Sequence, residues 1–356
     1  MICFKELNVA LDYFKDLNTK TDTRFWINNP SAEEVQLALA QGAVNCTTNP
    51  AYCSKLIQSE SEYITKLIDE VVLEYPDIEE AASVVYQRAV GRLMDMFSAL
   101  NEKSNGAQGF VTIQDDPRKD FDKEATIKAV FENKKLGKNF MAKIPVITGG
   151  IEAIGVCVEE NIPICATEVF SVAQAVHMCE EYKRACDRTG NAPALYMTHI
   201  SGIFDEYLGK FADRNGIKVD SELIKHAGIS IARKEYAVLK KMGANVTLLG
   251  GGARGMHHFT GLVGGDAHIT MNWSTARDIM DSDIVVENAI DIVTPQKIID
   301  ELKEKFVDFR RAYDSDGLAV SEFAEFGPVQ LFRNSFLKGW HLLIAEVASR
   351  KAAKAL

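Results

Sequence analysis

One lysine lies inside an apolar run, where its side chain could act as a nucleophile. In the run FMAKIPVIT, residues 140–148, Lys143 shares a strand face with Met141 and Pro145, because side chains alternate across a strand. Burial in such a strand disfavours the ammonium form and lowers the pKa of the amine. A neutral amine can attack a carbonyl carbon and form a Schiff base. The alternative is a lysine near a strand end whose charged tip reaches solvent.

Other polar residues also stand at the ends of apolar runs. They are Asn28, Asn49, Gln114, Thr167, Thr198 or His199, and the glycine-rich loop from Gly250 to Gly255. Core packing alone explains such a set poorly. If these runs are the strands of one parallel barrel, their carboxyl ends meet at one face, where the active sites of such barrels lie.

Eight short apolar runs alternate with longer helical patterns along the chain. The runs are Thr23–Asn28, Ala43–Asn49, Phe110–Gln114, Phe140–Pro145, Ile162–Thr167, Pro193–His199, Asn245–Gly250 and His268–Met271. Repeated strand-then-helix order indicates a parallel sheet. Because eight units follow one another without a linker, we expect an α/β fold of a single domain, a closed (β/α)8 TIM barrel over residues 1–356.

The segments between these runs carry helix signals. Ser31 followed by Glu34 predicts a capping box, and Ser171 predicts the N-cap of a helix. A helical insertion is expected over residues 52–108, and further helices over 285–356. In the insertion, apolar residues at helical spacing predict a long helix that packs on the outside of the barrel, namely Val85, Ala89, Leu93, Met96 and Leu100. A C-terminal helix is predicted over Phe332–Ala353.

Composition excludes several other classes of protein. The chain has 356 residues, 47% of them hydrophobic, and a net charge of −10. No basic stripe with interleaved aromatic residues is present, so we expect neither nucleic acid nor an anionic membrane as a partner. The first 17 residues predict a short amphipathic helix and contain no apolar stretch typical of a signal or a membrane span.

The seven cysteines are scattered and form no C-x-x-C pair. They indicate reduced thiols in a cytoplasmic protein rather than a disulfide framework or a zinc site.

Three motifs resemble those of one enzyme family. CTTNPAY, residues 46–52, resembles the T-T-N-P signature of the transaldolase family at the end of the second strand. AKIPVITGGIEAI, residues 142–154, resembles that family's active-site signature, and ATEVFSVAQA, residues 166–175, resembles the next strand and helix of the fructose-6-phosphate aldolase subgroup. The resemblance covers residues 23–280 and omits the insertion and the C-terminal helices.

The resemblance implies a role for each matched residue. Lys143 matches the lysine that forms the Schiff base, and Asn49 matches the asparagine that holds a substrate hydroxyl. Gln114 and Thr167 match the pair that holds a catalytic water, and Thr198 matches a residue that lines the pocket. With Thr47 of the same T-T-N-P motif, these residues form the expected site.

Two departures from the family pattern affect catalysis. Asn28 stands where the family has an aspartate that transfers protons, and an amide cannot act as a general acid or base. Ile203 replaces an arginine, and Ile200 replaces an aromatic residue. Candidate substitutes for the missing acid are His199, Asp115, Asp116 and Glu168. Because Thr198 is the inward residue, His199 is expected to point outward toward the helices.

The segment LLGGGARGMHH, residues 248–258, resembles the family segment that grips the substrate phosphate. Arg254 matches its arginine, while glycine replaces its serine. The backbone N–H groups of Gly251 and Gly252 are expected to contribute, because such groups in a turn before a helix bind anions. His257 and His258 lack the i, i+4 spacing of a helical metal pair, and no third ligand is suggested, so no metal is expected. No Rossmann or Walker motif is present, and no cofactor is expected.

The resemblance thus implies a cofactor-free transferase or aldolase of carbohydrate metabolism, as in the pentose phosphate pathway. It would transfer or release a dihydroxyacetone unit from a ketose or ketose phosphate through Lys143. Asn28, Ile200 and Ile203 favour two alternatives: an aldolase for another sugar, or a sugar-binding homologue with impaired catalysis. A third alternative is a scaffolding role for the amphipathic insertion and C-terminal helices. The sequence leaves open whether the chain forms a homo-oligomer.

Overall fold

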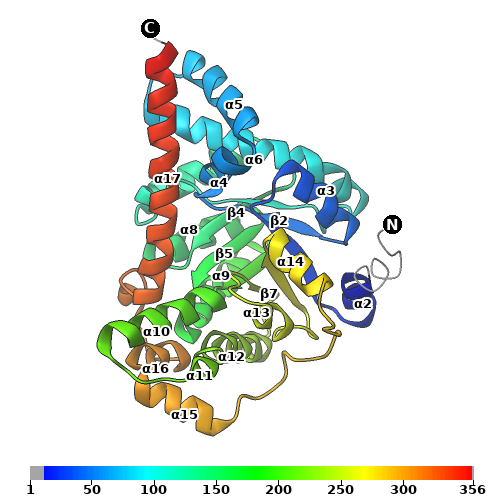
Figure 1. Ribbon diagram of the computed structural model, residues 1–356, viewed down its shortest axis with the longest axis vertical. Coiled ribbons are helices and arrows are strands. Elements are labelled where there is room, and N and C mark those ends of the chain that lie inside the picture. Colours follow the sequence, from blue (N-terminus) through cyan, green and yellow to red (C-terminus); the bar gives the residue numbers. More distant parts are fainter. Residues whose placement is uncertain (1–11, 355–356) are drawn as a thin grey trace.

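Eight parallel strands close into a barrel in the computed structural model, which describes residues 12–354 (Figure 1). The strands are β1 Arg24–Asn28, β2 Asn45–Thr47, β3 Val111–Ile113, β4 Phe140–Pro145, β5 Ile164–Val169, β6 Leu195–His199, β7 Val246–Gly250 and β8 Ala267–Met271. Each strand pairs with the next in sequence, and β8 pairs with β1, with Trp26 opposite Thr270. The predicted (β/α)8 barrel is therefore confirmed, and every strand overlaps its predicted run.

Helices surround the strands and extend from them. They are α2 Asp12–Lys20, α3 Ala32–Ala40, α4 Tyr52–Ser59, α5 Ser61–Glu74, α6 Ile78–Lys103, α7 Lys123–Lys134, α8 Thr148–Glu159, α9 Val172–Thr189, α10 Ser201–Asn215, α11 Ser221–Ile224, α12 Ala227–Met242, α13 His257–Thr260, α14 Trp273–Met280, α15 Gln296–Lys305, α16 Val307–Tyr313 and α17 Gly327–Lys354. Two short 3-10 helices cover Pro117–Lys119 (η1) and Val320–Glu322 (η2). Residues 1–11 of the predicted N-terminal helix, which include Cys3, lie outside the described residues.

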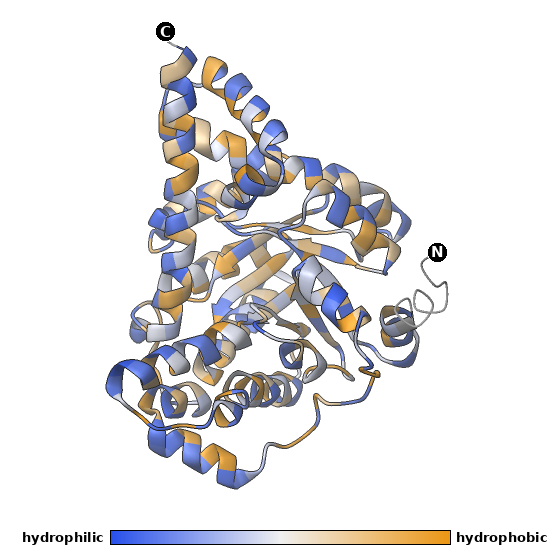
Figure 2. Cartoon of the chain, in the orientation of Figure 1, coloured by the Kyte–Doolittle hydropathy of each residue, from blue (hydrophilic) through white to orange (hydrophobic). Residues whose placement is uncertain are grey.

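The predicted helix starts are present. Ser31 and Glu34 form the capping box of α3, and the Ser171 side chain accepts a hydrogen bond from Gln174 N at the start of α9. Each cap gives a partner to backbone N–H groups that a helix cannot satisfy internally. Figure 2 shows hydrophobic residues along the central strands, whereas the surrounding helices carry both hydrophobic and hydrophilic residues.

The interior of the barrel contains one apolar layer below one polar layer. The apolar layer consists of Trp26, Val44, Phe110, Met141, Cys165, Tyr196 and Leu249. Side chains alternate across a strand, so residues two positions later point inward again, closer to the carboxyl ends. On five strands these residues are Asn28, Lys143, Thr167, Thr198 and Gly251. The apolar layer thus closes the bottom of the space in which the polar residues meet.

The insertion between β2 and β3 consists of three helices, α4 to α6. The predicted stripe faces the core, with Val85, Ala89 and Leu93 fully buried on α6. The C-terminal helix α17 begins at Gly327, five residues before the predicted start, and runs along one side of the molecule past α4, α6 and α5 (Figure 1). It therefore connects the mouth of the barrel to the tip of the inserted helices.

The cysteines within the described residues are free thiols. Cys46, Cys53, Cys157, Cys165 and Cys179 are buried, and Cys186 is partly exposed. Within residues 12–354 no helix combines the length and apolar character that crossing a bilayer would need.

Candidate active site

A cavity of about 540 Å³ opens at the carboxyl ends of the strands. Eight of the residues predicted from the sequence line it: Asn28, Thr47, Asn49, Lys143, Thr198, Gly251, Gly252 and Arg254. The remaining two, Gln114 and Thr167, do not line this cavity. Gln114 lines a second, smaller cavity of about 30 Å³ on the other side of Lys143, and Lys143 lines both.

Lys143 is buried at the junction of the two cavities. Its side chain is surrounded by the barrel, the residue is 8% exposed, and Nζ donates a hydrogen bond to Thr48 O at 2.8 Å. The Phe336 ring of α17 lies above it, with Nζ 5.8 Å from the ring centre. Burial lowers the pKa of Lys143 below its ordinary value of 10.5. This arrangement favours the neutral, nucleophilic amine.

Gln114 and Thr167 lie beside Lys143 on the neighbouring strands β3 and β5. Gln114 is 1% exposed, and its Nε2 donates to Glu168 Oε1 at 2.9 Å. Gln114 Oε1 and Thr167 Oγ1 are both buried and have no partner within the described residues. Buried polar atoms are almost always hydrogen-bonded, so these two oxygens indicate places for a water or a substrate group.

Asn28 is part of a polar network across β1, β2 and β8. Its Oδ1 accepts from Thr47 Oγ1 at 2.9 Å, and its Nδ2 donates to Asn272 Oδ1 at 2.9 Å. Thr47 Oγ1 lies 2.6 Å from Thr270 Oγ1. The amide is held by its neighbours at the cavity wall, which suits the binding of a hydroxyl better than proton transfer.

Asn49 follows β2 and lines the same cavity. Its Oδ1 accepts from Ala51 N at 3.0 Å, while its backbone N–H donates to Asn29 Oδ1 at 3.2 Å. Because Oδ1 is engaged in this turn, the amide N–H groups of Asn49 are the part of the side chain available to a ligand oxygen.

The glycine-rich loop after β7 packs directly on the start of α10. A Cβ atom at Gly202 would lie 2.3 Å from Gly252 O, so only glycine permits this contact. Gly252 has φ +65°, a conformation that glycine adopts readily. Ile200 and Ile203 contact this loop. The guanidinium of Arg254 pairs with Glu206 at 2.9 Å and lies at the cavity rim.

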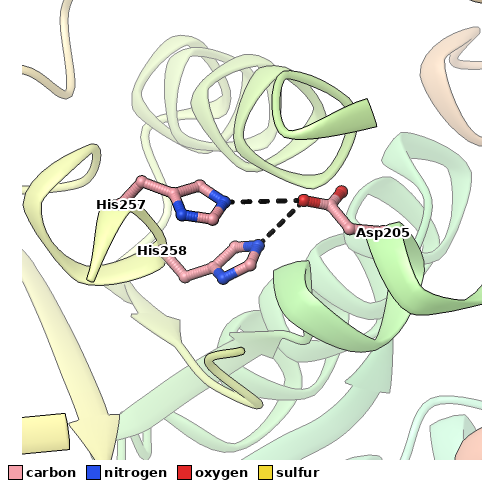
Figure 3. A group of neighbouring side chains, drawn as sticks. All are labelled: Asp205, His257 and His258. Carbon is pink, nitrogen blue, oxygen red and sulfur yellow. Dashed lines mark hydrogen bonds and ion pairs between the residues drawn. The ribbon is translucent and has the colours of Figure 1, made fainter. Parts of the chain in front are cut away.

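Two histidines and an aspartate form a cluster beneath the loop (Figure 3). Asp205 Oδ2 lies 2.9 Å from His258 Nε2 and 3.8 Å from His257 Nε2. Asp205 is thus a third potential ligand, which sequence spacing did not suggest. However, the backbone N–H of Arg254 donates to His258 Nδ1 at 3.1 Å, so Nε2 carries the proton of the neutral ring. A protonated Nε2 donates to Asp205 and cannot bind a metal, so the cluster connects the loop to α10.

The candidate substitutes for the missing aspartate have different surroundings. His199 is fully buried against Glu235 of α12, at 3.0 Å, and points outward as expected. Asp116 pairs with Arg118 at 2.7 Å, and burial raises the pKa of Asp115 at the edge of the small cavity. Glu168 accepts a hydrogen bond from a residue of the predicted site, Gln114.

Several cavity residues were not predicted from the sequence. They are Lys55 on α4, Thr270 and Asn272 at the end of β8, and Ser335 and Phe336 on α17. Lys55 and the α17 residues belong to the inserted and C-terminal helices, and their place at the mouth depends on how these helices fold back. Asn272 could have been found, because it follows the last strand at the carboxyl face.

Comparisons with known proteins identify the family of the chain. Residues 25–324 match the sequence profile of the family described as "Transaldolase/Fructose-6-phosphate aldolase". The chain is similar to proteins named "Transaldolase" from Mycobacterium tuberculosis and Mycobacterium bovis, at 27% identity over 231 residues. It is 26% identical over 231 residues to the transaldolase of an Arthrobacter species. The matched stretches cover 61% of this chain and 62% of each of these relatives.

Proposed function

Because the chain belongs to the transaldolase/fructose-6-phosphate aldolase family, we propose that it is a Schiff-base enzyme that transfers or releases a dihydroxyacetone unit from a ketose or ketose phosphate. The observation that carries the proposal is the buried amine of Lys143. It lies at the floor of a cavity of about 540 Å³ among polar side chains, and its pKa is lowered by burial.

In the proposed reaction, Lys143 attacks C2 of the ketose to form a carbinolamine, which loses water to form an imine. As the C3–C4 bond breaks, the C4 hydroxyl gives its proton to a water at the site, and the cationic imine accepts the electron pair of that bond. C4 leaves as the carbonyl carbon of an aldehyde, and an enamine remains on Lys143. The enamine carbon then attacks a second aldehyde, whose oxygen takes up a proton, or the enamine carbon itself takes up a proton. Hydrolysis of the resulting imine releases the product. The imine supplies the electron sink, so this chemistry requires no metal or organic cofactor.

The remaining residues of the site bind and orient the substrate in this proposal. Asn28 and Asn49 hold hydroxyl groups, and Thr47 fixes Asn28 through its hydrogen bond of 2.9 Å. Gln114 and Thr167 hold a water beside Lys143. Thr198, Gly251, Gly252 and Arg254 line the same cavity, where backbone N–H groups and the guanidinium suit a phosphate.

Reductive trapping tests the proposal directly. Incubation with fructose 6-phosphate and sodium borohydride should attach the reduced sugar to the peptide that contains Lys143, as measured by peptide mass spectrometry. Lys143→Met should abolish both the label and turnover. Lys55→Met is the matched control, because Lys55 lines the same cavity while its ammonium pairs with Glu34 at 3.1 Å. A label that persists in Lys143→Met, with unchanged activity, would rule out this function.

A second candidate is an enzyme for a different donor sugar, or a homologue with weak catalysis. Asn28 favours it, because the amide removes the family's proton-transferring group. Asn28→Asp tests it: the new carboxylate would face Asn272 Oδ1, and rotation of the Asn272 amide would turn an N–H toward it. A gain in cleavage of fructose 6-phosphate of about tenfold or more would identify a weakened transaldolase, whereas no gain would favour another donor.

A further inference from the structure

The backbone of Glu168 adopts a conformation that a regular β-strand does not contain. Its φ is +59°, in the left-handed region that strains the backbone of a residue with a side chain such as glutamate. The pairing of β5 with β6 shifts register between Ala166 and Val169, so Glu168 lies in an irregular step of the strand. The Gln174 side chain donates to Glu168 O at 2.9 Å and to Val146 O at 2.9 Å. The neighbouring structure therefore holds this residue in its strained conformation.

This irregular step of β5 places the Glu168 carboxyl inside the molecule and beside the candidate site. The residue is 1% exposed, and its Oε1 accepts from Gln114 Nε2. Three ionisable groups from different elements face it: Lys143 of β4, Asp120 after η1, and Arg333 of α17. Asp120 is also buried and lies 3.7 Å from Arg333 Nε. Burial raises the pKa of Glu168 to about 7, and Gln114 and Lys143 oppose that rise.

A small cavity lies beside Lys143 and Gln114, the residue that donates a hydrogen bond to the Glu168 carboxyl group. Its volume of about 30 Å³ is enough for a water molecule, and its walls include Gln114, Asp120, Lys143 and Pro145. Gln114 Oε1 and Thr167 Oγ1 have no partner within the described residues. Thr167 directly precedes Glu168 in the chain. A bound water would satisfy such oxygens and would link Lys143 to its neighbours by hydrogen bonds.

We propose that Glu168 supplies and recovers the proton of imine formation on Lys143, through a water held by Gln114 and Thr167. The inference rests on the proposed function, because it assigns the proton carrier of that same reaction. Asn28 cannot fill this role, and His199 and Asp116 are engaged with Glu235 and Arg118.

The proton returns to Glu168 within one catalytic cycle. In the carbinolamine, the C–O bond breaks while the hydroxyl oxygen takes a proton from the Glu168 carboxylic acid and leaves as water. The nitrogen lone pair forms the C=N bond, and Glu168 becomes a carboxylate. When the final imine is hydrolysed, water adds to the carbon, its released proton returns to Glu168, and the C=N pair returns to nitrogen. No other reactant is needed.

Glu168→Gln is the primary test, because the amide oxygen can still accept from Gln114 while the proton is lost. For a general acid we expect kcat to fall by about 10²- to 10⁴-fold. In the wild type, kcat/KM should decline as the pH rises above about 7, where Glu168 loses its proton, and this decline should disappear in the variant. Glu235→Gln is the control: it changes a buried glutamate that faces His199 on the outer side of β6, and should leave the profile unchanged.

A second variant separates proton transfer from a structural role. Glu168→Gly suits the left-handed backbone, removes the carboxyl and leaves space for a small acid. Formate should restore turnover in this variant in proportion to its concentration, and should not affect Glu168→Gln. A carboxyl that only positioned Gln114 would give neither the rescue nor the altered pH profile, and that result would overturn the inference.

Borohydride trapping distinguishes this inference from the proposed function. If wild-type Lys143 is labelled and Glu168→Gln keeps the wild-type rate and pH profile, the role of Glu168 is wrong and the function stands. If wild-type Lys143 is not labelled by any ketose, the function is wrong and the role of Glu168 with it. Slow labelling of Lys143 in Glu168→Gln, reaching the wild-type extent, supports both.

Discussion

The buried amine of Lys143 makes the free energy of unfolding depend on pH. The folded state holds this side chain away from water, whereas the unfolded chain exposes it. Below pH 10.5 the unfolded chain therefore binds a proton that the folded protein binds less readily. This difference works against folding at neutral pH, and it diminishes as the pH rises toward 10.5.

Lys143→Met should reveal this contribution. The free energy of unfolding of the wild type should rise relative to that of the variant as the pH is raised from 7 toward 10, by at most about 1.4 kcal/mol per pH unit. Urea unfolding at several pH values measures the difference. Lys55→Met, at a partly exposed lysine, serves as the reference, and wild-type and Lys143→Met curves that stay parallel would contradict a buried neutral amine.

At this scale the sequence located part of the cavity lining. The polar ends of the apolar runs, together with the three motifs, located eight of the residues that line the main cavity. The inward turn of Glu168 was not predictable, because it depends on a register shift between β5 and β6 that leaves no mark in the spacing of residues. The same holds for Asp205, which meets His257 and His258 only because α10 packs beneath the loop.

Among the elements, α17 connects the added helices to the catalytic face. Gly339 permits close packing of α17 on α4, since a Cβ atom there would lie 2.5 Å from Ala51 Cβ. One turn earlier on α17, Phe336 covers Lys143. The spacing of α17 from α4 therefore influences the shape of the cavity and the access of water to the amine.

Gly339→Ala should push α17 away from α4 and displace Phe336. We expect a loss of stability of about 1–3 kcal/mol from overpacking, together with a raised KM for the ketose. Gly209→Ala on α10 is the matched control, because a Cβ atom there has nothing within 4 Å. Thermal unfolding and steady-state kinetics measure both effects. Equal behaviour of the two variants would show that this contact is not needed.

Most elements followed from patterns within the chain. Apolar runs and the Ser31 and Ser171 caps identified strands and helix starts correctly. The start of α17 was predicted five residues late, and α4 and α5 were not separated from α6. Helix boundaries of this kind depend on tertiary contacts, such as the packing of α17 on α4 and α5, rather than on local spacing.

In the molecule as a whole, the inserted helices and the C-terminal end of α17 extend away from the barrel (Figure 1). Arg350 of α17 pairs with Asp69 of α5 at this tip, where both side chains are partly exposed. Exposed ion pairs contribute little to stability, about 0–1 kcal/mol. The tip and the catalytic face should therefore respond independently to substitution.

Arg350→Ala should loosen the tip and leave catalysis unchanged. We expect faster amide hydrogen exchange in residues 61–74 and 343–354, a change in global stability within about 1 kcal/mol, and wild-type kcat and KM. Hydrogen-exchange mass spectrometry and an activity assay check this. Altered kinetics would mean that the tip is coupled to the cavity, against the separation described here.

The five cysteines that are buried within residues 12–354 would report how the barrel opens during unfolding. A thiol-specific reagent reacts with a thiolate, and these sulfur atoms are shielded from solvent in different layers, from Cys165 inside the barrel to Cys53 and Cys179 on its helices. Their order of modification would record which layer loosens first during unfolding. The order of unfolding could thus be followed through the native cysteines, without an introduced probe.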